Sequence, residues 1–171
     1  VTSADDDRVG REFFPRLVTS IFPLGYAAAR AAAESLSKQQ KQRIRTILDV
    51  AAGAAPWSIA FAQAVPEARV TVVDYPEVTP IARRFVKRFG LAERFEYVEG
   101  NLREVDLGRA RYDLVLLGHI IHSEGEQWGK QLVRRCARAL RKGGLLLIAE
   151  MVPDDDRNGP VMPVLFGLNM L

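Results

Sequence analysis

The sequence predicts an α/β fold in which helices cover both faces of a doubly wound, mostly parallel sheet. Three observations lead to this prediction. From residue 43 onward, short apolar stretches alternate with stretches of helical periodicity. The apolar stretches show little internal alternation, as is typical of strands that are buried on both faces. The repeated strand–helix order indicates right-handed crossovers between parallel strands.

The predicted strands are short and rich in branched apolar residues. They cover residues 44–50, 69–73, 95–99, 112–118 and 145–151. In parallel sheets of this kind, ligands bind beyond the carboxyl ends of the strands. The residues that end each strand are therefore the first candidates for a site.

The predicted helices lie between these strands and at both ends of the chain. They cover residues 9–21, 24–40, 56–65, 78–89, 126–140 and 163–171. Pro23 and Gly25 are expected to separate the first two helices. Gly90 is expected to cap the helix over 78–89. We expect residues 1–42 to form N-terminal helices that lead into a core formed by residues 43–171.

Composition narrows the class of protein. The chain has 171 residues, the size of one domain, and its 48% hydrophobic content is sufficient for a core. A single cysteine allows no internal disulfide, which favours a reducing cytoplasm. The net charge of +3 is modest, and basic residues share their helices with apolar ones, so a nucleic-acid partner is not expected. No apolar stretch is long enough to span a bilayer, so no membrane association is expected.

The loop after the first strand is made almost wholly of tiny residues. Asp49 lies near the end of the strand, and Ala51, Gly53 and Ala55 follow before Pro56. Tiny residues let a ligand approach the backbone closely, and proline suits the first turn of a helix. An ordinary tight turn is the alternative interpretation.

Polar residues end the next two strands. Asp74 follows Asp49 by 25 residues and can accept hydrogen bonds from both hydroxyls of a ribose, although it could instead cap the following helix. Asn101 could accept a hydrogen bond from the exocyclic amine of adenine, or it could be a turn residue. Together, the tiny-residue loop and Asp74 predict a cofactor that contains adenosine.

The two histidines of the chain follow the fourth strand. His122 is placed to act as a general base, because the pKa of an unperturbed histidine is near neutrality. Glu150 ends the neighbouring strand, about 5 Å away in a parallel sheet, and could orient that imidazole. A buried structural histidine is the alternative. A metal bound by His119 and His122 lacks further ligands, so no metal is expected.

Six segments occur in a characteristic order and spacing. They are LDVAAG (48–53), VVDYPEV (72–78), GLAERFEYVEGNL (90–102), YDLVLLGHIIHSEGE (112–126), ALRKGGLLLIAE (139–150) and LNML (168–171). Over residues 13–171 the chain thereby resembles the bacterial and plant small-molecule O-methyltransferases of caffeate type. This family is a branch of the class I S-adenosylmethionine-dependent methyltransferases, which have a Rossmann-like fold.

The resemblance implies methyl transfer from S-adenosylmethionine to a hydroxyl of a secondary metabolite, with S-adenosylhomocysteine as product and a homodimer for the full-length protein. It implies catalytic roles for His122 and Glu150, and an acceptor pocket lined by Asn169 and Met170. The cofactor-binding residues that it implies are Asp49, Ala51, Gly53, Ala55, Asp74, Tyr75, Asn101, Leu102, Gly118 and His119.

The chain departs from the resembled family in three places. The family has glycine where this chain has Ala51 and Ala55, and alanine is strained wherever φ is positive. Ser123 and Glu124 stand where the family has Asp-Trp. The family's N-terminal winged-helix domain and its last two strands have no counterpart here. We therefore expect a chain truncated at both ends, with the fifth strand as an apolar edge.

Two further functions remain open at this stage. The altered glycine loop is compatible with a homologue that binds the cofactor without methylating. The basic helices are compatible with an RNA methyltransferase. A nicotinamide dehydrogenase fits less well, because the G-x-G-x-x-G spacing is absent.

Overall fold

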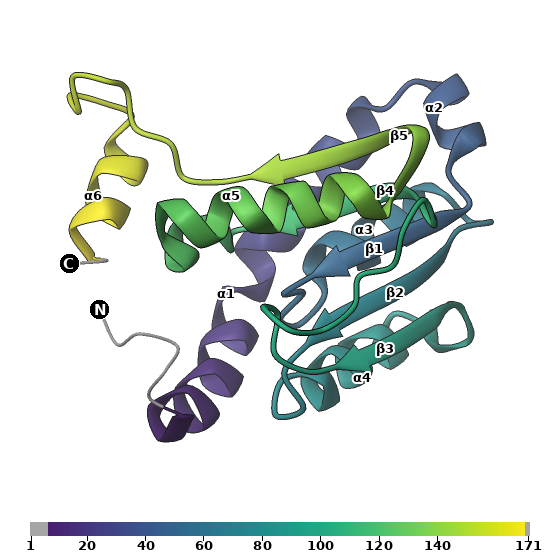
Figure 1. Ribbon diagram of the computed structural model, residues 1–171, viewed down its shortest axis with the longest axis horizontal. Coiled ribbons are helices and arrows are strands. Elements are labelled where there is room, and N and C mark those ends of the chain that lie inside the picture. Colours follow the sequence, from purple (N-terminus) through teal and green to yellow (C-terminus); the bar gives the residue numbers. More distant parts are fainter. Residues whose placement is uncertain (1–6, 170–171) are drawn as a thin grey trace.

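The computed structural model describes residues 7–169, with side chains described for residues 16–168. Within this range a five-stranded, fully parallel sheet has the strand order β3-β2-β1-β4-β5 (Figure 1). The strands are β1 (Thr46–Val50), β2 (Arg69–Asp74), β3 (Phe95–Glu99), β4 (Tyr112–Gly118) and β5 (Leu140–Ala149). The predicted α/β fold with a doubly wound parallel sheet is confirmed.

The helices flank this sheet. They are α1 (Asp7–Ser35), α2 (Lys38–Arg43), α3 (Pro56–Ala64), α4 (Thr79–Arg88), α5 (Ile121–Ala139) and α6 (Val161–Asn169), with a short 3₁₀ turn, η1 (Ala92–Arg94). Gly90 has a φ of 71° and its N–H donates to the carbonyl of Lys87, so it closes α4 as expected.

The expected break at Pro23 and Gly25 is wrong, because α1 runs through both residues as one helix. Tertiary packing overrides the local signal, since α1 lies along α3 and buries Phe22 and Ala29 in the core. At Gly25 a β-carbon would lie 3.2 Å from Cγ of Pro56, so this glycine permits a close approach of the two helices.

Other boundaries also differ from the prediction. The predicted helix over 24–40 is wrong, because α1 ends at Ser35 and Ser37 caps a separate α2 by accepting the N–H of Gln40. β5 begins at Leu140 rather than 145, because the ladder with β4 shifts register and accommodates extra residues. α5 begins at Ile121 rather than 126, and Gly125 interrupts it with a φ of 70° and a ψ of 168°. The apolar periodicity of the sequence predicted only the part of α5 that follows this break.

Alternate residues of the strands face two apolar clusters, one on each side of the sheet. The first cluster joins one sheet face to α1, α3 and α4 and includes Ile47, Val70, Val72, Leu114, Leu116, Phe61 and Val86. The second joins the other face to α5 and includes Leu48, Val50, Val73, Val115, Leu117, Leu132 and Cys136. Figure 1 shows α5 crossing one face of the sheet, with α1 and α3 behind it.

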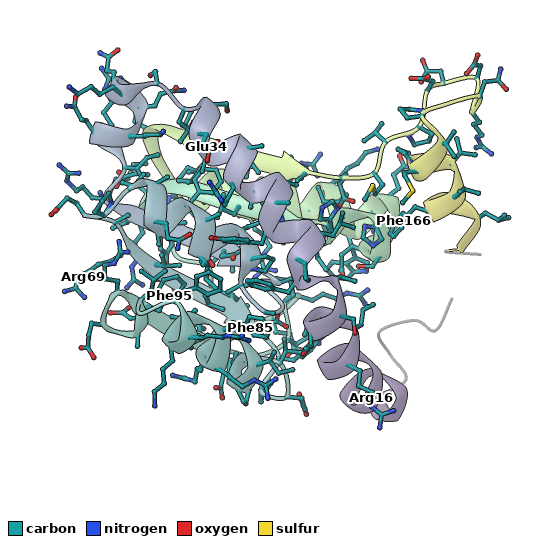
Figure 2. All side chains as sticks on the ribbon, turned by 180° about the vertical axis from the view of Figure 1, so that it is seen from behind. Arg16, Glu34, Arg69, Phe85, Phe95 and Phe166 are labelled. Carbon is teal, nitrogen blue, oxygen red and sulfur yellow. The ribbon has the colours of Figure 1, made fainter. Side chains whose placement is uncertain are left out.

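Aromatic side chains tie α1 to this core. The ring of Phe22 lies 4.3 Å from that of Phe85 on α4, and Tyr26 lies 5.2 Å from Phe89. Figure 2 labels Phe85 among the side chains of this region. The N-terminal helix therefore packs as part of the same hydrophobic core. β3 and β5 are the two edge strands of the described sheet, and Ile148 of β5 is 45% exposed. None of the described helices has both the length and the apolar character required to cross a membrane.

Candidate functional site

The carboxyl ends of the strands bring the predicted site residues to one rim of the sheet. β1 is paired with β2 and β4 so that Val50 lies beside both Val73 and Leu117. Gly118 lies beside Ala149, the last residue of β5. The loops that follow Val50, Asp74, Gly118 and Ala149 therefore emerge side by side.

The tiny-residue turn has an unusual backbone. Ala51, Gly53 and Ala55 have φ values of 55°, 59° and 61°, so all three are left-handed. This conformation costs an alanine about 1–2 kcal/mol. The strain expected for Ala51 and Ala55 is therefore present. At Gly53 a β-carbon would lie only 3.1 Å from Cγ1 of Val18, so α1 closes over the turn at this point.

Asp49 is buried beneath the turn. Its Oδ2 accepts the backbone N–H of Ser58 at 3.2 Å, which ties β1 to the first turn of α3. Burial raises the pKa of this carboxyl to about 7, although hydrogen bonds from Ser58 act in the opposite direction. Asp49 therefore stabilises the turn from below.

Asp74 joins the turn to the end of β2. Its Oδ2 accepts the N–H of Gly53 at 2.7 Å, and its Oδ1 accepts the N–H of Tyr75 at 2.8 Å. Burial raises the pKa of this carboxyl to about 6, and the two N–H groups partly offset that effect. A carboxylate has about four lone-pair sites, so acceptor capacity remains for a ligand.

Asn101 forms a turn after β3. Its Oδ1 accepts the backbone N–H of Arg103 at 2.9 Å, and its carbonyl accepts the N–H groups of Glu104 and Val105. The turn alternative weighed from the sequence is therefore present. Leu102, next in the chain, is buried against the sheet face that α5 covers.

His122 and Glu150 meet as the sequence predicted. Nδ1 of His122 lies 2.8 Å from Oε2 of Glu150, and Oε1 of Glu150 accepts the N–H of Ile121 at 2.6 Å. Burial alone would raise the pKa of Glu150, but His122 and the N–H groups of Ile121 and His122 outweigh it, and the pKa is lowered. The carboxylate is therefore ionised at neutral pH beside the imidazole.

An aromatic ring from α6 covers the imidazole. Phe166 meets His122 edge-on, with ring centroids 4.9 Å apart (Figure 2). An open groove of about 660 Å³ continues from His122 along α5, past Gly125 and Val133 to Arg134. The other residues expected on α6 lie outside what can be described: the side chain of Asn169 and all of Met170.

His119 lies behind the His122–Glu150 pair. Its φ is 59°, and its N–H donates to the carbonyl of Ala149 at 2.8 Å. Burial lowers the pKa of its imidazole. Within the described residues, no group of three or more side chains is arranged to hold a metal ion.

Trp57 was not found by sequence reasoning. It lies in the first turn of α3, it is buried, and its ring is 5.9 Å from that of His119. At Gly118 a β-carbon would lie 2.3 Å from Cδ1 of Trp57, so only glycine fits there. A tryptophan directly after the tiny-residue turn was the available signal, but its partner across the sheet rim could not be read from the chain.

Comparison with known proteins shows the family of the chain. A family model described as an O-methyltransferase domain matches residues 23–171. The 3-hydroxy-5-methyl-1-naphthoate 3-O-methyltransferase of Streptomyces sahachiroi is 34% identical over 128 residues, which cover 75% of this chain and 37% of that protein. Acetylserotonin O-methyltransferase of Bos taurus is 33% identical over 125 residues, covering 73% of this chain and 35% of that protein.

Solved structures show the same fold. An O-methyltransferase family 2 protein from Planctomyces limnophilus, in complex with apigenin, has a TM-score of 0.82 and 27% identity, covering 94% of this chain and 49% of its own. An O-methyltransferase family protein from Burkholderia thailandensis has a TM-score of 0.78 and 25% identity, covering 98% of this chain and 48% of its own. The chain thus spans between a third and a half of the length of these proteins.

Proposed function

Because the chain belongs to the O-methyltransferase family, we propose that it transfers a methyl group from S-adenosylmethionine to a hydroxyl of a small secondary metabolite. The observation that carries this proposal is the His122–Glu150 pair at the sheet rim. Since the chain spans only part of the length of its relatives, the activity is a proposal for the whole protein.

The donor set of the rim suits an adenosyl cofactor. The remaining acceptor sites of Asp74 match the two hydroxyls of a ribose, and beside them the left-handed turn leaves Ala51 and Gly53 partly exposed, whereas Ala55 is buried. Around them lie the other proposed binding residues, which are Asp49, Tyr75, Asn101, Leu102, Gly118 and His119. When bound, S-adenosylmethionine supplies a methyl group on a positively charged sulfur. An oxygen nucleophile that attacks the methyl carbon displaces this sulfur as the leaving group.

His122 would act on the acceptor hydroxyl. With Nδ1 held by Glu150, the basic nitrogen is Nε2, and it can accept the hydroxyl proton. The ionised Glu150 then stabilises the positive imidazolium, as in other base-plus-carboxylate pairs. General-base assistance of this kind contributes about 10²–10⁴ in rate.

An aromatic acceptor is the substrate class that the surroundings of His122 support. Phe166 presents an aromatic edge to the imidazole, next to the open groove along α5. Flat aromatic molecules pack well against such rings. The naphthoate in the name of the Streptomyces relative and the apigenin in the Planctomyces complex are hydroxylated aromatic molecules.

For the whole protein we also propose a cytoplasmic homodimer.

One alternative has an observation of its own. The strain at Ala51 and Ala55 favours weaker cofactor binding, which would suit a homologue that holds the cofactor without methylating. The RNA alternative has less support. Arg83 of the basic helix α4 lies over the ring of Tyr97 and pairs with Glu99 at 3.6 Å, as side chains of a solvated face do.

The direct test is product formation. The protein is incubated with S-adenosylmethionine and a panel of hydroxylated aromatic molecules that includes 3-hydroxy-5-methyl-1-naphthoate and apigenin. Mass spectrometry should detect a methylated product together with S-adenosylhomocysteine. If S-adenosylhomocysteine binds but no acceptor is methylated, the non-methylating alternative is preferred.

A further inference from the structure

The backbone of α5 is interrupted directly after the turn that carries His122. Gly125 has non-helical backbone angles, with a φ of 70° and a ψ of 168°, so residues 121–124 form a short turn of their own. Glu150 holds this turn from the sheet side by accepting the N–H of Ile121. A second contact holds the turn from another direction.

Glu124 and Arg103 make that second contact. Nε of Arg103 lies 3.4 Å from Oε2 of Glu124, and only 10% of the Glu124 side chain is exposed. The guanidinium of Arg103 also lies 4.8 Å from the ring centroid of Trp128, which follows the break at Gly125. Arg103 therefore contacts α5 on both sides of its interruption.

Arg103 belongs to the loop that the proposed cofactor site uses. It follows Asn101 by two residues, and its own N–H closes the turn on the Asn101 side chain. Farther along α5, Arg135 donates to the carbonyls of Leu102 and Val105 and fixes the same loop. The loop is thus anchored, and Arg103 can transmit its position to the turn that carries His122.

We propose that Arg103 is a positioning residue. By contacting both Glu124 and Trp128, it sets where the His122 imidazole lies relative to the Asn101 loop. This inference rests on the proposed function, which gives His122 and Asn101 their roles. Glu124 stands at a position where the chain departs from the resembled family. The contact between Arg103 and Glu124 therefore depends on a residue that is particular to this chain.

The contacts of Arg103 with Glu124 and Trp128 should have a modest effect on local opening. A partly exposed ion pair contributes little, and a cation–π contact adds a comparable amount. Their loss should raise the local opening of residues 121–124 by about 5- to 10-fold without unfolding the sheet.

Hydrogen exchange of backbone amides measures this opening. In Arg103→Ala, which loses both contacts, amides of residues 121–124 should exchange about 5- to 10-fold faster, while those of β1 stay unchanged. In Glu124→Gln, which keeps the contact between Arg103 and Trp128, the increase should be smaller, about 2- to 5-fold. Arg103→Lys keeps the charge and should restore part of the protection. Arg109→Ala, which removes an exposed arginine from the same connection, is the matched control and should have no effect.

Two results would overturn the proposal: unchanged exchange in residues 121–124, or equal acceleration throughout the chain, which would indicate general destabilisation. A parallel titration of the unaltered protein with S-adenosylhomocysteine separates the two proposals. Its failure would count against the cofactor site, whereas the exchange comparison still decides the role of Arg103.

Discussion

The two oxygens of Glu150 have different partners: one lies 2.8 Å from Nδ1 of His122, and the other accepts the N–H of Ile121 at 2.6 Å. One carboxylate thus orients the imidazole and caps the turn that carries it. A partner that fixes both ring and backbone limits the freedom of a base and holds its free nitrogen in place.

Replacing His122 should slow methyl transfer without weakening the binding of the cofactor product. We expect His122→Ala to lower turnover by about 10²–10⁴-fold, because the acceptor hydroxyl loses its base. Affinity for S-adenosylhomocysteine should be preserved. The measurement is single-turnover methylation with an acceptor from the panel, next to calorimetry. Gln127→Ala, at an exposed position farther along α5, is the control. Unchanged turnover in His122→Ala would remove the imidazole from the mechanism.

Asp49 should make folding stability depend on pH. Burial raises its pKa from 3.8 to about 7, so the folded protein binds this proton more tightly than the unfolded chain does. Its contribution to stability therefore falls as pH rises from about 4 to about 7, by up to ~4 kcal/mol. Asp49→Asn keeps an acceptor for Ser58 but cannot ionise.

Urea denaturation of both proteins at about pH 5 and about pH 8 isolates this effect. Asp49→Asn should gain stability relative to the unaltered protein as the pH is raised. Asp74, whose pKa is raised to about 6, contributes a slope of the same sign in both proteins, and its charge also helps to raise the pKa of Asp49. A difference between the two that does not change with pH would contradict the assignment.

Glycine should be the better residue at position 51. Ala51→Gly relieves a left-handed alanine, worth about 1–2 kcal/mol, and loses about 0.5–1 kcal/mol to the greater freedom of glycine in the unfolded chain. The expected net gain is roughly 0.5–1 kcal/mol. Ala52→Gly, one residue further without a positive φ, should destabilise. Thermal unfolding measures both, and a loss of stability in Ala51→Gly would refute the strain.

Gly118 should tolerate no side chain. In Gly118→Ala the new methyl group would collide with the ring of Trp57, and the displacement should cost about 1–3 kcal/mol. Gly167→Ala is the control, because open space surrounds this residue in α6 and alanine favours helix. Equal stability of the two variants would show that the ring of Trp57 does not press against β4.

Local pattern sufficed for much of the fold. β3 and β4 have the bounds that their apolar residues predicted, whereas β2 ends at Asp74, one residue later than predicted, and β5 ends at Ala149, just before Glu150. The His122–Glu150 contact followed from the geometry of neighbouring parallel strands. Pattern failed where tertiary contacts decide. Packing of α1 on α3 overrode the signal of Pro23.

The remainder of the site depends on contacts between distant segments. Arg103 and Glu124 are 21 residues apart in the sequence, and no local pattern around either residue predicts their contact. Trp57 faces Gly118 across the sheet rim in the same way. Asn101 shows the converse, because the turn role that the sequence left open beside a ligand role is a local contact of its side-chain oxygen with the N–H of Arg103.

Titration with S-adenosylhomocysteine by calorimetry, on the unaltered protein and on Asp74→Asn, tests the adenosyl site at the sheet rim most directly. We predict one site for the unaltered protein and about 10- to 100-fold weaker binding in Asp74→Asn, because hydrogen bonds from the ribose hydroxyls to a charged acceptor are worth about 1.5–3 kcal/mol. Equal affinity in the two proteins, or no heat of binding in the unaltered protein, would contradict the site.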